Sequence, residues 1–155
     1  MKEQSRIFDG GGGSVHTQYA ALCWRASGGM LEVLLITSRE TGRWVVPKGW
    51  PIKGRAPHEV AAREAWEEAG VIGSADPNCL GLFGYRKAMG SDEPDRAVLA
   101  AVYPVAVGRL AEKFPEAGQR KRCWFAPEQA AGLVAEPDLA AVIAAFRPTS
   151  GQDAT

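Results

Sequence analysis

Short apolar runs alternate with polar and turn-forming residues along most of the chain, and this pattern predicts many strands and few helices. The Ser27-Gly28-Gly29 segment lies between two apolar runs and is typical of a hairpin turn. Pro47 ends a short apolar run that begins at Trp44. Six strands are therefore predicted, at residues 19–25, 30–37, 44–46, 80–89, 97–107 and 122–125.

Three segments have a helical pattern, at residues 57–69, 128–134 and 138–146. The first begins with Pro57, at a position where a helix tolerates proline, and stops at Gly70, which suits the left-handed conformation that follows many helices. Strands and helices are mixed without a regular strand–helix–strand alternation. The sequence therefore predicts an α+β fold, in the form of an α/β/α sandwich with a mixed sheet.

The length of 155 residues predicts one domain. Residues 1–14 end in a run of four glycines and a serine, which predicts a flexible N-terminal segment outside the fold. Residues 148–155 are expected to form a C-terminal tail. The single domain is accordingly placed at residues 15–147.

Composition excludes several classes of function. The 18 basic residues are balanced by 18 acidic ones, which argues against a protein that binds long nucleic acids. No apolar run approaches the roughly 20 residues that span a bilayer, so no membrane partner is expected. The N-terminus lacks the apolar stretch of a secretory signal. Cys23, Cys79 and Cys123 form no metal-binding pair, which favours a cytoplasmic protein in which the cysteines are buried.

The first predicted helix carries an unusual concentration of acid. Glu64, Glu67 and Glu68 fall within an arc of about 100° on its surface, and like charges at this spacing destabilise a helix by roughly 0.2–0.5 kcal/mol per pair. Alanines 61, 62, 65 and 69 occupy the adjacent face, where small side chains allow close packing on a sheet. A divalent cation such as Mg²⁺ is the natural counter-charge. The alternative is a solvated acidic face.

The residues around these glutamates carry a longer pattern. Gly49 lies fourteen residues before Arg63, and the helix reads Arg63-Glu64-Ala65-x-Glu67-Glu68-x-Gly70-Val71. This pattern resembles the Nudix box, the signature of the Nudix hydrolase family, at eight of its nine specified positions. The departure is Arg55, which stands where the family has its first glutamate.

The resemblance implies the family's α/β/α sandwich over about residues 15–147, with the box helix packed against the sheet. It also implies that Glu64, Glu67 and Glu68 bind Mg²⁺ or Mn²⁺, that Arg63 orients carboxylates, and that a phosphoanhydride bond is hydrolysed. Arg63, Glu64 and Glu67 are thus the candidate catalytic residues. The general base is left open between Glu67 and acids on later loops, which are Asp92, Glu93, Glu112 and Glu116.

Basic residues cluster in three segments, at positions 39–55, 86–87 and 120–122, which together hold ten of the 18 lysines and arginines. Such clustering favours a highly phosphorylated ligand, because both side chains form charge-assisted hydrogen bonds with phosphate. For any single residue, a solubilising surface charge is the alternative. The predicted substrate-binding residues are Arg39, Lys48, Gly49, Lys53, Arg55, Arg86, Arg120 and Arg122.

Within the family, Pro47-Lys48-Gly49 and the Arg120-Lys121-Arg122-x-Trp124-Phe125 segment are similar to diphosphoinositol polyphosphate and diadenosine polyphosphate hydrolases, whereas Trp50-Pro51 and Arg55 depart from them. We therefore expect a small polyphosphorylated substrate and a monomer or homodimer. Two alternatives stay open. One is a nucleotide-sugar or damaged-nucleotide pyrophosphatase. The other is a non-catalytic ligand-sensing domain, which only Arg55 supports.

Overall fold

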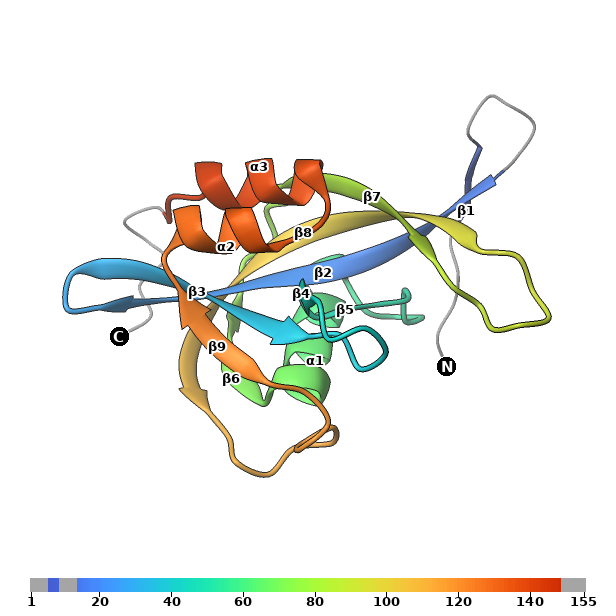
Figure 1. The fold of residues 1–155 in the computed structure, drawn as a ribbon. Coiled ribbons are helices and arrows are strands. Elements are labelled where there is room, and N and C mark those ends of the chain that lie inside the picture. Colours follow the sequence, from blue (N-terminus) through green and yellow to red (C-terminus); the bar gives the residue numbers. More distant parts are fainter. Residues whose placement is uncertain (1–5, 9–13, 149–155) are drawn as a thin grey trace.

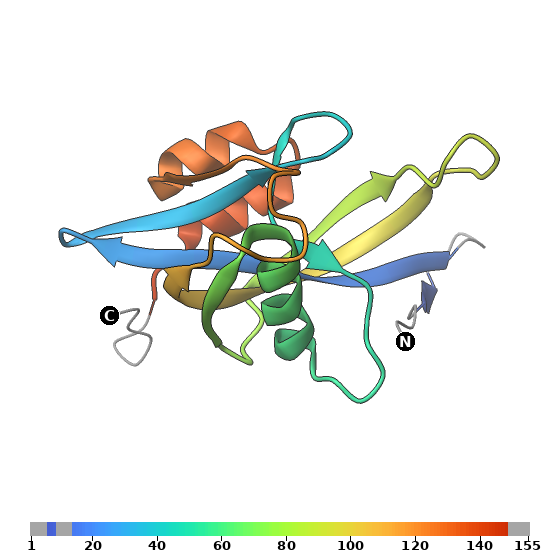
Figure 2. The same cartoon turned by 90° about the horizontal axis from the view of Figure 1, so that it is seen from below.

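A computed structural model describes residues 6–8 and 14–148. Its centre is one mixed β-sheet, covered on one face by helix α1 (Pro57–Ala69) and on the other by α2 (Pro127–Leu133) and α3 (Pro137–Ala145) (Figure 1). The view from below shows α1 on the side of the sheet opposite the α2–α3 pair (Figure 2). The predicted α/β/α sandwich is therefore confirmed.

The strands of the described residues pair in the order β4-β3-β2-β8-β6, with β1 and β5 also paired to β2, β7 to β8 and β9 to β3. The long central strands β2 and β8 run parallel, and every other pairing is antiparallel. The sheet is thus mixed, as predicted. The strand bounds are β1 Arg6–Phe8, β2 Ser14–Ser27, β3 Met30–Thr37, β4 Trp44–Val45, β5 Lys48–Gly49, β6 Val71–Ala75, β7 Gly81–Lys87, β8 Arg96–Leu110 and β9 Arg122–Phe125.

Three elements, β3, β9 and α1, have the predicted bounds. Strands β2 and β8 extend further at both ends than their apolar runs, because they continue to pair with each other and with neighbouring strands. Helices α2 and α3 each begin one residue earlier than predicted, at a proline in the first helical position.

Three strands were not predicted. Strand β6 shows no apolar alternation, since residues 72–74 are exposed, and it is defined by its pairing with the end of β8. Strand β5 has two residues, too few to show a period, and pairs with β2. Strand β1 lies in the segment placed outside the domain, yet it pairs with the start of β2. Residues 1–5, 9–13 and 149–155 lie outside the described residues, so their flexibility stays a prediction.

Two apolar cores hold the layers together. Between α1 and the sheet, the fully buried Ala61, Ala65 and Ala69 face sheet residues such as Leu34 and Ile36. Small side chains on the helix let it lie close to the strands, as the sequence predicts. The core under α2 and α3 has larger members, which include Leu22, Trp24, Phe83, Leu139, Ile143 and Phe146.

Both ends of α1 are fixed by hydrogen bonds from backbone N–H groups. At the start, the Glu59 carboxylate accepts a hydrogen bond of 2.8 Å from the backbone N–H of Ala56. At the end, Gly70 has φ 69° and ψ 24°, and its N–H donates to the carbonyl groups of Ala65 and Trp66. This left-handed conformation favours glycine, so Gly70 terminates the helix where the sequence predicts.

The cysteines only partly follow expectation. Cys23 is buried, but Cys79 and Cys123 are exposed, so the prediction that they are buried is wrong for these two. Cys123 lies on β9, which pairs with β3 alone among the described strands and is therefore less covered than a central strand. In the described part of the chain, no helix is both long and apolar enough to cross a bilayer.

We expect Ala65→Leu to lower the free energy of unfolding by about 1–3 kcal/mol, because the added atoms must fit into a filled interface between α1 and the sheet. Urea unfolding measures the change. Ala62→Leu is the matched control, since Ala62 is only half-buried on the same helix, and it should change the free energy by about 0.5 kcal/mol or less. Equal effects of the two substitutions would contradict the close packing described here.

Candidate active site

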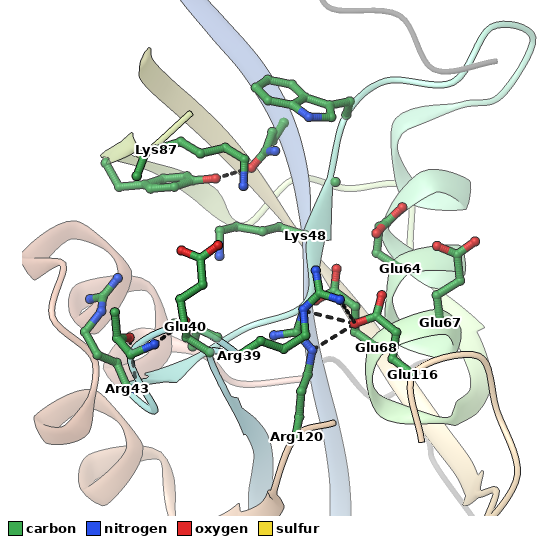
Figure 3. A pocket seen from close by; sticks show the side chains of 18 of the residues that line it. Arg39, Glu40, Arg43, Lys48, Glu64, Glu67, Glu68, Lys87, Glu116 and Arg120 are labelled. Carbon is green, nitrogen blue, oxygen red and sulfur yellow. Dashed lines mark hydrogen bonds and ion pairs between the residues drawn. The ribbon is translucent and has the colours of Figure 1, made fainter. Parts of the chain in front are cut away.

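The acidic side chains of α1 form one side of a cavity of about 390 Å³ (Figure 3). Glu64 is buried, with 3% of its surface exposed, while Glu67 and Glu68 are half-buried. Other parts of the lining come from the loop between β3 and β4, from β5 next to α1, and from β7. The lining residues are Gln18, Ser38, Arg39, Glu40, Thr41, Arg43, Val45, Lys48, Gly49, Trp50, Glu64, Glu67, Glu68, Tyr85, Arg86, Lys87, Ala88, Glu116 and Arg120.

Gly49 makes room for Glu64. Strand β5 pairs with β2 beside α1, which brings the α-carbon of Gly49 against the Glu64 side chain. A β-carbon at position 49 would lie 2.3 Å from Cδ and 2.5 Å from Oε2 of Glu64, far inside contact distance. Any larger residue therefore displaces this carboxylate. The glycine of the sequence motif is explained by this contact.

Glu68 lies in an environment that opposes its ionisation. Its pKa is raised to about 8, chiefly by burial and also by the charge of Glu64, with which it shares a hydrogen bond. Arg120 and Lys48 act in the opposite direction. Glu68 is thus held against a second carboxylate at a poorly solvated position, where its charged form is disfavoured.

Arg120 contacts two acidic residues of the cavity, Glu68 and Glu116. Its Nε donates a 3.1 Å hydrogen bond to Oε1 of Glu116, and its Nη2 lies 3.1 Å from the same oxygen and 3.7 Å from Oε1 of Glu68. Its Nη1 donates to the backbone carbonyl of Thr37 at 3.1 Å. Only 11% of the side chain is exposed, so the guanidinium is surrounded by protein groups.

The remaining basic groups fall into two sets. Arg39 and Arg43 are paired with carboxylates, at 3.9 Å from Glu116 and 3.5 Å from Glu136. Lys48, Arg86 and Lys87 form no salt bridge with any carboxylate of the described residues. The Lys48 ammonium lies 5.0 Å from the centre of the Tyr85 ring. Burial lowers the pKa of Lys48, and Lys87 and Arg120 lower it further, although Glu68 and Glu136 raise it.

The structure brings most of the predicted site residues together. Glu64, Glu67 and Glu68 line the cavity with Arg39, Lys48, Gly49, Arg86 and Arg120.

Four predicted residues lie outside the lining. Arg63 is exposed and its Nε contacts Oε1 of Glu67 at 3.1 Å. Lys53 and Arg55 are exposed on the loop between β5 and α1. Arg122 donates a 2.7 Å hydrogen bond to the carbonyl of Ala69, so it holds the end of α1.

Glu116 is the one loop acid, among those proposed from the sequence, that reaches the cavity. Its backbone N–H donates a 3.0 Å hydrogen bond to the carbonyl of Glu67, which fixes the loop against the end of α1. Glu112, Asp92 and Glu93 are not among the lining residues, and Glu93 pairs with Arg96 at 3.9 Å.

Sequence reasoning missed Gln18, Trp50 as a lining residue, Tyr85 and the contribution of Lys87. The Tyr85 hydroxyl donates a hydrogen bond to Oε1 of Gln18, which lies 67 residues earlier in the chain. Pairing of β7 with β8, and of β8 with β2, brings the two together. This contact cannot be seen without the strand order. The one local feature of the sequence that pointed to this strand was the basic pair Arg86-Lys87, next to Tyr85.

The chemistry of the carboxylates fits a divalent cation, although among the described residues no group of three or more His, Cys, Asp and Glu side chains is arranged as a metal site. Glu64 and Glu68 form a close, poorly solvated carboxylate pair beside an open cavity. Mg²⁺ is commonly bound by one or two carboxylates together with waters and substrate phosphates. The Glu64–Glu68 pair, with Glu67 beside it, therefore offers as many carboxylates as Mg²⁺ commonly uses.

Comparison with known proteins identifies the family. The chain matches the family model of the NUDIX domain over residues 16–146, so it belongs to the Nudix family, and the prediction of a Nudix hydrolase is confirmed. Human diphosphoinositol polyphosphate phosphohydrolase 3-beta is 33% identical over 129 residues, which cover 82% of this chain and 73% of that protein. Rat diphosphoinositol polyphosphate phosphohydrolase 2 is also 33% identical, over 82% of this chain and 66% of its own length.

Solved structures show the same fold. The C. elegans Ap4A hydrolase superposes with a TM-score of 0.60 at 20% identity, covering 84% of this chain and 94% of that one. The E. coli dihydroneopterin triphosphate pyrophosphohydrolase also gives 0.60, at 14% identity, over 84% of this chain and 93% of that one. At these identities the likeness establishes the fold alone.

We expect Gly49→Ala to lower the free energy of unfolding by about 1–3 kcal/mol, because the new methyl group meets the Glu64 side chain. In a double-mutant cycle with Glu64→Ala, part of this loss should be recovered. Gly84→Ala is the matched control, because a β-carbon there comes no closer than 3.8 Å to a backbone oxygen. Additive effects of Gly49→Ala and Glu64→Ala in urea unfolding would argue against the contact.

Proposed function

We propose that the protein is a Mg²⁺-dependent hydrolase, also served by Mn²⁺, that cleaves a phosphoanhydride bond in a small polyphosphorylated molecule of the dinucleoside polyphosphate or diphosphoinositol polyphosphate type. One observation carries the proposal: a single cavity is lined both by the three α1 glutamates and by basic side chains that form no salt bridge with a carboxylate of the described residues (Figure 3). A metal-bound polyphosphate has the complementary distribution of charge.

The number of cations favours several phosphate groups. Arg120, Arg39 and Arg43 are neutralised by carboxylates, but Lys48, Arg86 and Lys87 have no described carboxylate within salt-bridge distance. These three groups lie on β5 and β7 and line the same cavity as the α1 glutamates. Lysine and arginine donors in such positions bind successive phosphates while the acidic side binds the metal. The names of the two diphosphoinositol polyphosphate phosphohydrolases that resemble this chain support the same substrate class.

Different residues of the cavity would have different roles in the reaction. Glu64 and Glu68, with Glu67, would hold the cation, which supplies charge neutralisation and an activated water when it is bound. Arg63 contacts the Glu67 carboxylate at 3.1 Å and orients it from the solvent side. Glu67 is our first choice for the general base, and Glu116 is the loop acid best placed to share that role, because it alone of the loop candidates lines the cavity.

The two alternatives are less well supported. Arg55, the substitution that motivates a non-catalytic sensor, is exposed on the loop between β5 and α1 and is not among the lining residues. A nucleotide pyrophosphatase calls for an aromatic sandwich around a base. Of the aromatic residues in the lining, Tyr85 is stacked beside Phe83 at 6.0 Å and covered by Lys48, and Trp50 meets His16 edge-on.

Two further points belong to this proposal. The three cysteines are free, which fits a protein of the reducing cytoplasm. We also propose that the protein acts as a monomer or a homodimer.

The decisive assay incubates the protein and Mg²⁺ with diadenosine polyphosphates, diphosphoinositol polyphosphates, ADP-ribose and oxidised nucleotides, and measures released phosphate products. We expect turnover of the first two classes and its loss on removal of divalent ions with EDTA. Glu67→Gln should lower kcat by at least about 100-fold, because it removes a carboxylate from the reacting centre. Glu112→Gln removes an exposed carboxylate of the loop outside the cavity, and should leave the rate unchanged.

Unchanged turnover in Glu67→Gln would show that the α1 glutamates do not form the active site. Tight binding of one substrate without any turnover would favour the sensing domain. Preferential turnover of ADP-ribose or oxidised nucleotides would favour the nucleotide pyrophosphatase.

A further inference from the structure

Arg120 was predicted from the sequence to bind substrate phosphate, and its contacts point elsewhere. We infer that Arg120 is a positioning residue, which holds the carboxylates of Glu68 and Glu116 in fixed places beside the metal-binding pair. This inference rests on the proposed function, because it concerns the residues that would hold the cation. It differs from that proposal in what Arg120 itself touches.

Every nitrogen of the guanidinium already lies next to a protein oxygen. An arginine side chain has five N–H donors on three nitrogens. All three nitrogens of Arg120 already contact protein oxygens: Nε and Nη2 contact Glu116, Nη2 also faces Glu68, and Nη1 reaches the Thr37 carbonyl. The side chain is 11% exposed, against 55% for Arg39 on the same side of the cavity. A phosphate at Arg120 would have to compete with the Glu68 and Glu116 carboxylates for the same guanidinium.

The backbone around Arg120 is equally fixed. Lys121 donates from its backbone N–H to Oγ1 of Thr37 at 2.8 Å, and Thr37 donates from its own N–H to the Lys121 carbonyl at 3.0 Å. Arg120 thus projects from a segment that is tied to the end of β3. Its guanidinium reaches from there to Glu68 on α1 and back to Glu116, four residues earlier on the same loop (Figure 3).

One planar group therefore connects three elements: the end of β3, the loop at residues 111–121, and helix α1. The loop is also joined to α1 through the backbone hydrogen bond from Glu116 to Glu67. Because Glu68 and Glu116 come from different elements, a shared guanidinium fixes their relative position. Neighbours that orient metal ligands commonly change metal affinity or activity 10- to 100-fold when they are replaced.

Lysine cannot reproduce this arrangement. It carries the same charge, but its single nitrogen is a point donor rather than a planar fork. Arg120→Lys therefore keeps the charge beside Glu68 and removes the geometry, which separates positioning from electrostatic attraction. A residue that merely attracted phosphate would tolerate this replacement much better than one that must contact Thr37, Glu68 and Glu116 together.

The test measures Mn²⁺ binding in the absence of substrate, by electron paramagnetic resonance of the free ion, in the full-length protein. We expect Arg120→Lys to weaken Mn²⁺ binding about 10- to 100-fold, and to lower kcat with little change in KM. Arg86→Lys is the contrasting variant, expected to leave Mn²⁺ affinity unchanged and to raise KM. Arg109→Lys, on the exposed end of β8, serves as the surface control.

Glu116→Ala provides a second measurement, which is needed if Arg120→Lys does not fold. It leaves Arg120 paired with Glu68 alone, so the cation must compete with a stronger ion pair and Mn²⁺ binding should weaken. A variant that combines Arg120→Lys with Glu116→Ala should bind Mn²⁺ about as weakly as whichever single variant has the lower affinity, because both changes break the same set of contacts. Multiplied effects would indicate that Glu116 acts independently of Arg120.

Parent-like Mn²⁺ affinity in Arg120→Lys, together with a KM that rises with the number of substrate phosphates, would overturn the inference and restore Arg120 as a phosphate ligand. This outcome is separate from failure of the proposed function. If the parent binds Mn²⁺ but hydrolyses none of the polyphosphates, the proposed reaction is wrong, while the change in Mn²⁺ affinity still decides the role of Arg120.

Discussion

The contact between Gly49 and Glu64 is the constraint on which the site depends. A buried carboxylate is costly unless charge or hydrogen bonds compensate it, and here the backbone of β5 lies against it so closely that no side chain fits at position 49. Close approach is possible because α1 presents Ala61, Ala65 and Ala69 to the sheet. The alanine face and the glycine therefore serve one purpose. They place acidic groups at the edge of an apolar interface, where Glu68 ionises reluctantly and where a cation or an arginine is the available compensation.

The basic side chains around the cavity are consequently of two kinds, which differ in whether a carboxylate pairs with them. Some are used internally: Arg43 pairs with Glu136, and Arg120 pairs with Glu116 and Glu68. Others, such as Lys48, have no described carboxylate at salt-bridge distance and face the open space. A chain with equal numbers of acidic and basic residues thus contains a site in which both signs are concentrated. Net charge describes the solubility of such a protein, whereas the local pairing of charges determines which ligand the cavity can accept.

Much of this arrangement could be predicted from the sequence, for a physical reason. The bounds of α1 follow from Pro57 and Gly70, and the spacing of its glutamates and alanines places both on defined faces of one helix. These are local relations, and local relations are visible in a sequence. The remainder depends on strand pairing. Tyr85 and Gln18 meet only because β8 lies between their strands. Arg122, two residues after Arg120, is turned toward the end of α1 instead of the cavity. Neighbouring residues of the same type therefore have different roles that no local pattern distinguishes.

The parallel pairing of β2 with β8 has a consequence for the way the molecule is assembled. It joins residues about eighty positions apart, His16 with Val98 for example, and the cavity lining draws on segments from Gln18 to Arg120. Contacts at such separation form after the entropy of closing a long loop has been overcome, and they are slow to form. The glutamates of α1 have their full surroundings only when these long-range pairings are formed, so the site depends on contacts that no local segment can supply by itself.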